Sequence, residues 1–295
     1  MRRIFSWTPS KKSSAQATDA RPPLSSGGVS AGPRTLSVDC GGTGMKSLVL
    51  DAAGVPVSTR MRVRTPYPCP PVVFADTIER LANGAGVGFD RVSVGMPGLV
   101  RHGVVRWTPH YVTESGPFSD VRSDLALLWQ NLDVRGLLES RLGRPTRVVN
   151  DAELAGLSVI SGRGYEVMLT LGTGLGFAHF SDGVVLPKIE VSAAPFRNGS
   201  TFDERLGHHA RTARSTRAWS RDVHRALRRL YAVFYWDRAY LGGGGSKHLR
   251  VSVDEYVTLV GNRAGLLGGV RLWDDANSLG VIAPLPATDD STTTG

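Results

Sequence analysis

The chain carries one pattern in each half: a β-branched apolar run, a glycine-rich turn, a second apolar run and a further turn. The first copy is LSVDCGGTGMKSLVLDAAGVPV, residues 36–57, and the second is YEVMLTLGTGLGFAHFSDGVVL, residues 165–186. Each copy is typical of a β-hairpin built around a glycine loop. A repeated supersecondary unit indicates a repeated architecture, so the sequence predicts a duplicated α/β fold with a cleft between two lobes.

Other periodic segments divide the chain further. Apolar spacing predicts helices in residues 70–83 and 123–143, in the long segment from Ala218, and in the small-residue segment 260–273, with strands at 89–100 and 146–151. We expect an N-terminal lobe over 35–149 and a C-terminal lobe over 150–283. Residues 1–34 are polar and rich in Ser, Gly and Pro, which predicts a disordered basic tail, and 284–295 form a second tail.

Bulk composition excludes several classes of protein. Hydrophobic residues make up 41% of the 295 residues, yet no window approaches the roughly 18 consecutive apolar residues of a membrane helix. The N-terminus has no apolar signal-peptide core, and two cysteines are too few for a disulfide framework or a cysteine-rich zinc site. We therefore expect a cytoplasmic protein that does not bind membranes. The net charge of +9 allows an anionic partner without choosing one.

Three glycine-rich turns follow predicted strands. In DCGGTGMK, a phosphate could be bound by the backbone amides of Gly41 and Gly42, the Thr43 hydroxyl and the Lys46 ammonium. Asp39, at the start of the same turn, could hold Mg²⁺. The second turn, LGTGLG, contains Gly172, Thr173 and Gly174, and the third, LGGGGSK, contains Gly243 and Gly244. Any of these turns could be a plain tight connection. Three in one chain, each at a strand end, favour a phosphate-bearing ligand.

The segment VVNDAELAGL allows two interpretations. Asn150 and Asp151 follow a strand-like run and precede a predicted helix, so either side chain could simply cap that helix. Alternatively, they lie where α/β folds bind ligands, at the carboxyl end of a strand. There Asp151 could accept a hydroxyl proton as general base while Asn150 binds a neighbouring hydroxyl. The segment alone favours the cap.

The order of these motifs resembles the ROK family of sugar kinases, and within it the polyphosphate glucokinase branch. The matching segments are VDCGGTGMK, VGMPGLVRHGVVR, VVNDAELAGL, LTLGTGLGFA, YLGGGGSK and AGLLGGV, and PGLVRHGVVR points to the polyphosphate branch. The resemblance covers about residues 36–272. The resemblance implies a two-lobed, actin-like ATPase fold, related to ribonuclease H, whose central cleft holds Mg²⁺ and polyphosphate or ATP as donor. It also implies that the last helix returns to the N-terminal lobe.

The resemblance assigns roles to individual residues. Asp39 would serve the metal and the phosphates, Gly41 to Thr43 and Gly172 to Gly174 would wrap the phosphates, and Asp151 would be the catalytic base. Gly243 and Gly244 correspond to the adenosine-type loop. The family also makes a homodimer the expected assembly.

The sugar-binding part departs from the family pattern. Where the family has Glu-x-Gly-His, this chain has PKIEVSAAPF, which keeps Glu190 but places Ser192 and Ala193 at the Gly and His positions. An expected asparagine is missing near WTPHYV, where His110 is the nearest polar residue, and a loose match offers Glu204 as a further acidic contact. The zinc motif of many family members is absent, as it is in the polyphosphate branch. The identity of the sugar acceptor is thus less well predicted than the phosphoryl-transfer reaction.

A stripe of arginines allows two interpretations, a solvated helix face or a track for a polyanion. Five arginines recur at helical steps, namely Arg214, Arg217, Arg221, Arg225 and Arg228. A solvated helix face is the simpler interpretation, whereas polyphosphate docking would suit the family branch. Nucleic acid is disfavoured because no aromatic or groove-reading features accompany the stripe.

The sequence therefore predicts a kinase that transfers a phosphoryl group from polyphosphate or ATP to a sugar hydroxyl. Glucose is the default acceptor of the family. The alternative is a catalytically weak or inactive ROK-like protein that binds a sugar or phosphate and regulates another process, and the altered IEVSAA segment motivates it.

Overall fold

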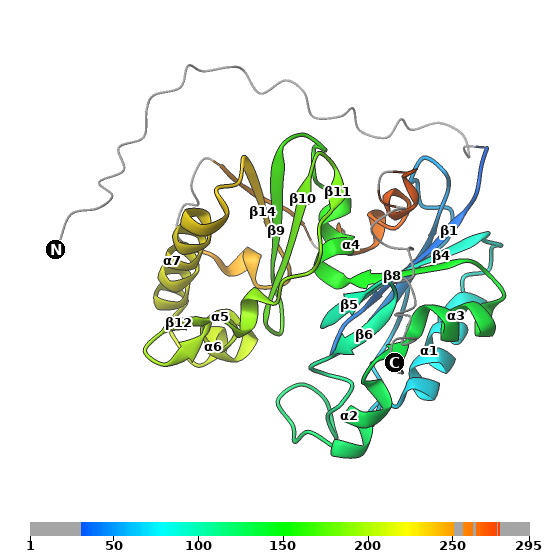
Figure 1. The fold of residues 1–295 in the computed structure, drawn as a ribbon, viewed down its shortest axis with the longest axis horizontal. Helices are drawn as coiled ribbons and strands as arrows, with labels where there is room; N and C mark the ends of the chain where they lie inside the picture. Colours follow the sequence, from blue (N-terminus) through cyan, green and yellow to red (C-terminus); the bar gives the residue numbers. More distant parts are fainter. Residues whose placement is uncertain (1–30, 251–255, 262–263, 276, 278–295) are drawn as a thin grey trace, which may run out of the picture.

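The computed structural model describes residues 31–250, 256–261, 264–275 and 277, arranged around two five-stranded sheets (Figure 1). The two predicted tails lie outside the described residues except for 31–34. Within the described residues, no helix has both the length and the apolar character needed to cross a membrane.

The first sheet has the strand order β3-β2-β1-β4-β8. Its strands are β1 (Thr35–Cys40), β2 (Met45–Leu50), β3 (Met61–Val63), β4 (Arg91–Met96) and β8 (Thr146–Asn150). A small three-stranded sheet consists of β5 (Leu99–Arg101), β6 (Val104–Trp107) and β7 (Leu132–Asp133). The helices of this half are α1 (Pro71–Asn83), α2 (Ser123–Trp129) and α3 (Val134–Leu142). One apolar core, which includes Phe74, Tyr111 and Trp129 in mutual ring contact, joins the helices to the sheet.

The second sheet has the order β11-β10-β9-β14-β15. Its strands are β9 (Tyr165–Leu171), β10 (Leu175–Ser181), β11 (Val184–Val185), β14 (Arg238–Gly242) and β15 (Val257–Leu259). The remaining elements of this part are β12 (Pro195–Arg197), β13 (Ser200–Thr201), α5 (Phe202–Leu206), α6 (His208–Thr212), α7 (Thr216–Phe234), and the short 3₁₀ helices η1 (Val191–Ala193) and η2 (Ser246–His248). The apolar face of α7, centred on Trp219, packs into the core of this sheet.

The two sheets share one connectivity, which confirms the predicted duplication. β1 pairs antiparallel with β2 and parallel with β4, and β9 likewise pairs antiparallel with β10 and parallel with β14. The first two glycine-rich turns therefore lie at hairpin tips, and the third follows the carboxyl end of the parallel strand β14. Parallel strands direct their carboxyl ends to one edge of a sheet, where ligands bind in α/β folds.

Helix α4 (Asp151–Leu157) lies between the two sheets (Figure 1). It contacts β4 of the first sheet, β9 and β10 of the second, and the short helix α8 (Ala264–Leu267). Close packing here depends on glycine: a Cβ on Gly156 would lie 2.3 Å from the Phe180 ring, and one on Gly268 would lie 1.9 Å from the Leu154 carbonyl oxygen. The helix thus couples the two halves without room for larger side chains.

The small-residue segment 260–273 is less helical than predicted. Only α8 and the 3₁₀ helix η3 (Arg271–Trp273) form, and 262–263 lie outside the described residues. Trp273 fixes the end of this segment to the first sheet, since its indole Nε1 donates to Ser93 Oγ at 2.8 Å and the guanidinium groups of Arg91 and Arg147 both lie over its ring. These contacts, rather than helical periodicity, determine the path of the backbone.

Candidate active site

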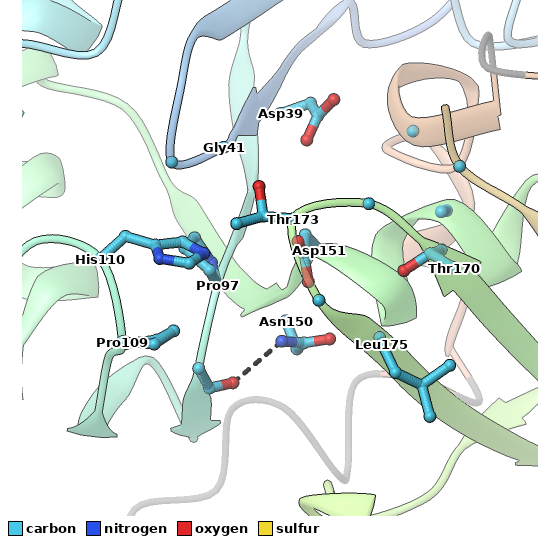
Figure 2. A pocket seen from close by; sticks show the side chains of 18 of the residues that line it. Asp39, Gly41, Pro97, Pro109, His110, Asn150, Asp151, Thr170, Thr173 and Leu175 are labelled. Carbon is cyan, nitrogen blue, oxygen red and sulfur yellow. Dashed lines mark hydrogen bonds between the residues drawn. The ribbon is translucent and has the colours of Figure 1, made fainter. Parts of the chain in front are cut away.

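The three glycine loops and α4 line a single cleft of about 560 Å³ (Figure 2). Its lining contains nearly every residue predicted for the site: Asp39, Gly41, Gly42, Thr43, Lys46, His110, Asn150, Asp151, Gly172, Thr173, Gly174, Glu190, Gly243 and Gly244. Residues more than 200 positions apart in the chain therefore meet in one space, as the duplicated hairpins predicted.

Asp151 is the first residue of α4 and lies in the cleft. The pKa of its carboxyl is raised to about 6, chiefly by burial and also by the neighbouring Asp39 carboxylate, while the Lys188 ammonium opposes the shift. A carboxyl group with this pKa is ionised at neutral pH yet basic enough to accept a proton. The carboxylate also accepts from the Ala152 amide at 2.9 Å, so it assists the helix terminus as well.

Asn150 caps the helix and fixes the position of its neighbour. Its side-chain oxygen accepts from the Ala152 amide at 2.9 Å, and its Nδ2 donates to the Gly98 carbonyl at 2.9 Å (Figure 2). The buried Glu153 completes a capping box by accepting from the Asn150 amide at 2.8 Å. The helix-cap interpretation of this segment is therefore confirmed. Any bond from Asn150 to a sugar hydroxyl stays a prediction.

The first glycine loop is held from outside the cleft. Gly41 donates to the Gly44 carbonyl at 3.0 Å, which closes the turn. Thr65 Oγ1 donates to the Gly41 carbonyl at 2.6 Å, and the Tyr67 hydroxyl donates to the Gly42 carbonyl at 2.7 Å. Because both carbonyls are engaged on the far side, the loop conformation is set before any ligand arrives. These two hydroxyls carried no motif by which the sequence could reveal them.

Asp39 and Lys46 form an ion pair at the wall of the cleft. The Lys46 ammonium lies 3.0 Å from Asp39 Oδ2, and the two residues are direct partners in the β1–β2 ladder. Lys46 therefore balances the charge of Asp39. Figure 2 shows Asp39 and Asp151 directed toward the same space, with Thr173 of the second loop between them.

The second glycine loop is held by the segment after β13. Gly172 donates to the Gly174 carbonyl at 2.9 Å, Leu175 donates its amide to Asp203 Oδ1 at 2.7 Å, and the His208 amide donates to the Thr173 carbonyl at 2.9 Å. A Cβ on Gly174 would lie only 1.9 Å from Asp203 Oδ1. Glycine is therefore required here because a carboxylate occupies the space of a side chain.

The acceptor side of the cleft differs from the prediction at one acidic residue. Glu204 does not line the cleft; its carboxylate accepts from the Thr201 amide at 2.8 Å in a second capping box. The adjacent Asp203 lines the cleft instead. Successive helical residues point in directions about 100° apart, so a loose match of FDERLG could not choose between them. The prediction of Glu204 as a cleft contact is wrong.

Two further residues bear on the predicted sugar contacts, one in the segment that the family resemblance assigns to sugar binding and the other at His110. The Ser192 hydroxyl donates to Glu190 Oε1 at 2.5 Å, so the serine that replaces glycine orients the retained carboxylate. The His110 ring packs against Gly42, where a Cβ would lie 2.7 Å from the ring, and burial lowers the pKa of this imidazole to about 4. His110 is therefore neutral at physiological pH, so one ring nitrogen can donate a hydrogen bond and the other can accept one.

Lys188 is a site residue that the sequence did not single out. It lines the cleft although the whole residue is only 3% exposed, and its ammonium donates to the Phe177 carbonyl at 2.5 Å. Its charge lowers the pKa of both Asp151 and Glu153. A lone lysine in an apolar stretch resembles any surface lysine in sequence, and only the packing of β10 against this segment reveals that it is buried.

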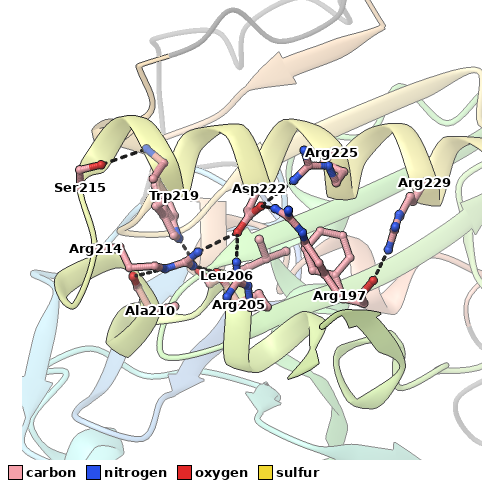
Figure 3. Close-up of polar contacts among 12 residues, drawn as sticks. Arg197, Arg205, Leu206, Ala210, Arg214, Ser215, Trp219, Asp222, Arg225 and Arg229 are labelled. Atoms are coloured by element: carbon pink, nitrogen blue, oxygen red, sulfur yellow. Dashed lines mark hydrogen bonds and ion pairs between the residues drawn. The ribbon is translucent and has the colours of Figure 1, made fainter. Parts of the chain in front are cut away.

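The predicted arginine stripe is not one helix face (Figure 3). Arg214 precedes α7, whose N-cap is Ser215, and its guanidinium pairs with Asp222 at 2.7 Å. Together with Arg214, three more described arginines, Arg197, Arg205 and Arg225, pair with the same carboxylate. The prediction that Arg214 continues the helical stripe is wrong because the chain turns at Ser215. Arg217, Arg221, Arg225 and Arg228 are exposed on α7, and none of the five lines the cleft.

Comparison with known proteins agrees with this geometry. The family model described as "ROK family" matches residues 35–187. The polyphosphate glucokinase of Mycobacterium tuberculosis is 28% identical over 268 residues, which cover 88% of this chain and 92% of that protein. The polyphosphate glucokinase of Mycobacterium leprae is 27% identical over 296 residues, covering 96% and 83% respectively.

Solved structures confirm the predicted two-lobed, actin-like fold. The inorganic polyphosphate/ATP-glucomannokinase from Arthrobacter sp. strain KM superposes with a TM-score of 0.68 at 28% identity, covering 81% of this chain and 97% of that one. A ROK family glucokinase from Streptomyces griseus has a TM-score of 0.66 at 20% identity, covering 81% and 98%. With the family model matching more than half of its length, this chain belongs to the ROK family.

Proposed function

We propose that this protein is a carbohydrate kinase that transfers a phosphoryl group from polyphosphate or ATP to a sugar hydroxyl. Relatives of similar length are named polyphosphate glucokinase, and a solved relative at 28% identity is named a polyphosphate/ATP-glucomannokinase. Glucose is the first acceptor to test, with glucose 6-phosphate as product.

The position of Asp151 is the observation that supports the proposal most. A half-buried carboxylate with a pKa of about 6 lies in the same cleft as two glycine-rich hairpin tips. In phosphoryl transfer the protein mainly positions the reactants and stabilises charge, with one base to orient and deprotonate the nucleophile. Asp151 would accept the sugar hydroxyl proton, and the amides of the glycine loops would donate to the oxygens of the transferring group. A regulatory protein would need none of this arrangement around a base.

The donor set of the cleft fits Mg²⁺. Asp39 presents a carboxylate beside the glycine loops and lines the same cleft as Asp151, and its charge raises the pKa of Asp151; both observations support a cation site here. Mg²⁺ prefers oxygen ligands and is commonly held by one or two carboxylates together with substrate phosphates. We propose Asp39 as the protein ligand. When bound, the ion would neutralise charge on the phosphates, and Lys46 would be released from Asp39 toward them.

On the acceptor side, Glu190, Asp203, Asn150 and His110 are the polar residues available to sugar hydroxyls. The substitution of histidine by Ala193 removes one expected hydrogen bond, worth about 0.5–1.5 kcal/mol. Asp203, which takes the place predicted for Glu204, adds a carboxylate on the same side. We therefore expect sugar binding to be retained with altered selectivity among hexoses.

The wider organisation follows the same proposal. We propose that the lobes divide near residue 150 and that the two parts, 35–149 and 150–283, close on the donor and the acceptor. Helix α8 would belong with the first lobe, because its Leu266 packs against Leu48 and Leu50. A homodimer in the cytoplasm is the expected state. Size-exclusion chromatography with light scattering tests the assembly.

A direct assay tests the proposed reaction. Purified protein with Mg²⁺ is incubated with ATP or polyphosphate and a panel of hexoses, and sugar phosphate is measured, with Asp151→Ala as the control. We expect phosphorylation of glucose or a close relative in the wild type and its loss in the variant. Donor binding without turnover on any sugar would refute the kinase function and support the regulatory alternative.

A further inference from the structure

A row of charged side chains crosses three strands of the first sheet at one level. Asp39 of β1 is the ladder partner of Lys46 on β2, and Lys46 is the ladder partner of Arg62 on β3. Side chains of directly paired residues lie on the same face of a sheet. Neighbouring strands are about 4.8 Å apart, so the row reaches roughly 10 Å from Asp39 to the edge strand.

Arg60, which immediately precedes β3, extends this row beyond the start of the edge strand. It lies two residues from Arg62, at a spacing of about 7 Å on the same face, because side chains alternate along an extended chain. Arg60, Arg62 and Lys46 all line the cleft, whereas Arg64, the next arginine in TRMRVRT, does not. The cleft is thus continuous with a basic edge that begins at the phosphate loop. We call Lys46, Arg62 and Arg60 the edge row.

The two arginines of the edge row are available to a ligand. Both are exposed, and neither forms an ion pair with any residue that the structure describes. The backbone at Gly44 lets Arg62 approach the loop, since a Cβ there would lie 3.5 Å from the Arg62 Nε. A guanidinium without a carboxylate partner, on the rim of a phosphate cleft, is well suited to bidentate contact with phosphate oxygens.

The arginines around α7 are arranged differently. Arg197, Arg205, Arg214 and Arg225 converge on Asp222, whose side chain is only 4% exposed (Figure 3). Their guanidinium groups are already oriented by a buried carboxylate and by backbone carbonyls, including that of Arg205 for Arg214. Because this cluster does not line the cleft, a chain bound there has no continuous path to Asp151.

We infer that the edge row is the subsite for the distal phosphates of a polyphosphate chain, and that the donor leaves the cleft along β3 rather than along α7. The inference rests on the proposed function and specifies where its polymeric donor lies. The glycine loops and Asp39 receive the transferring phosphate and its nearest neighbours, and Arg62 and Arg60 pair with phosphates further along the chain. ATP ends in an uncharged nucleoside after three phosphates, so it offers the outer arginine no equivalent partner.

Direct binding and kinetics with donors of different length test the subsite. The double variant Arg60→Ser/Arg62→Ser is compared with the wild type for affinity and KM toward long-chain polyphosphate, tripolyphosphate and ATP, at low and high salt. We expect about tenfold weaker binding of the long chain, from the loss of two exposed charge-assisted contacts, and little change for ATP. The salt sensitivity of long-chain binding should also decrease.

Two matched controls define the outcome. Arg64→Ser removes an exposed arginine of the same strand segment outside the cleft, and Arg217→Ser/Arg221→Ser removes two charges from α7; both should leave long-chain affinity nearly unchanged. An equal loss for all three donors, no loss at all, or a larger loss in the α7 variant would overturn the inference. If no sugar is phosphorylated but long-chain binding still depends on Arg60 and Arg62, the subsite stands and the kinase function fails.

Discussion

The donor side and the acceptor side of the cleft follow the family pattern to different degrees. On the donor side, the hairpin tips at Gly41 and Gly172 retain the glycine-threonine motif and are closed by backbone hydrogen bonds. On the acceptor side, Ser192 and Ala193 replace the expected Gly and His, and Lys188 is buried nearby. Phosphate recognition uses main-chain amides and tolerates little change, whereas hydroxyl recognition uses side chains that can be exchanged one at a time.

The boundary between the two sides is Asp151. It faces Asp39 on the donor side, while Lys188 and Glu190 act on its charge from the acceptor side. Substitutions at Asp151 or in the glycine loops should therefore stop turnover with every sugar. Substitutions in the acceptor segment should mainly change which sugar is used.

The largest effect is expected at the base itself. Asp151→Asn should lower kcat by about 10²- to 10⁴-fold with every donor and every acceptor, because the amide cannot accept the hydroxyl proton. Measurements of kcat and of donor affinity in the same preparation check this, with donor affinity expected to remain. If the variant kept more than a tenth of the wild-type kcat, a residue other than Asp151 would be the base, and Asp151 would not separate the donor side from the acceptor side.

The second effect concerns the contact between the two sides. Gly174→Ala would place a Cβ 1.9 Å from Asp203 Oδ1, so either the loop or the acidic side chain must move. We expect kcat/KM to fall by about 100-fold, since displacements of 1 Å in a site have costs of that order. Gly88→Ala, at a glycine with no neighbouring atoms within 4 Å, is the control. Equal activity of the two variants would show that the sides are mechanically independent.

The third effect is on stability rather than activity. The folded-state pKa of Asp151 is raised from 3.8 to about 6, chiefly by burial, so its ionisation opposes folding and stability falls as pH rises through this range. Asp151→Asn should therefore be more stable than the wild type at pH 7, by up to about 3 kcal/mol, and should show no such gain near pH 4. Urea unfolding at the two pH values checks this. A destabilised variant at pH 7 would mean that the carboxylate is compensated in the folded protein.

The fourth prediction concerns Lys188, an acceptor-side residue whose charge lowers the pKa of Asp151. Lys188→Met removes the ammonium that lowers the pKa of Asp151, so the acidic limb of the kcat/KM profile should move to higher pH. The wild-type limb is expected near pH 6, with activity lost as Asp151 is protonated below it. Lys247→Met, an exposed lysine outside the cleft lining, is the matched control. An unchanged limb would restrict Lys188 to a packing role.

The smallest effect is expected at the serine that replaces glycine. Ser192→Ala removes the hydrogen bond to Glu190 Oε1, and a single such bond contributes about 0.5–1.5 kcal/mol. KM for the acceptor should change by about 2- to 10-fold, while KM for the donor and kcat stay constant. A steady-state comparison over several hexoses measures this. A change in donor KM instead would contradict the separation of the two sides.

Sequence reasoning succeeded where local pattern and local structure coincide. The hairpins, α1, α7 and the capping residue Asn150 were all predicted, because β-branched alternation, helical spacing and cap chemistry act over a few neighbouring residues. It failed at Glu204, where a one-residue difference changes the direction of a side chain, and at Arg214, where a turn interrupts the apparent periodicity.

The sequence by itself determined the duplicated hairpins, the three glycine-rich turns and the candidate base, since each depends on residue types at short spacing. Only the tertiary structure decided that Asp203 rather than Glu204 enters the cleft, that Lys188 is buried beside Asp151, and that Asp222 gathers four described arginines. These features arise where segments distant in the chain pack together. Burial and charge are then shared between elements, and no single segment carries the information.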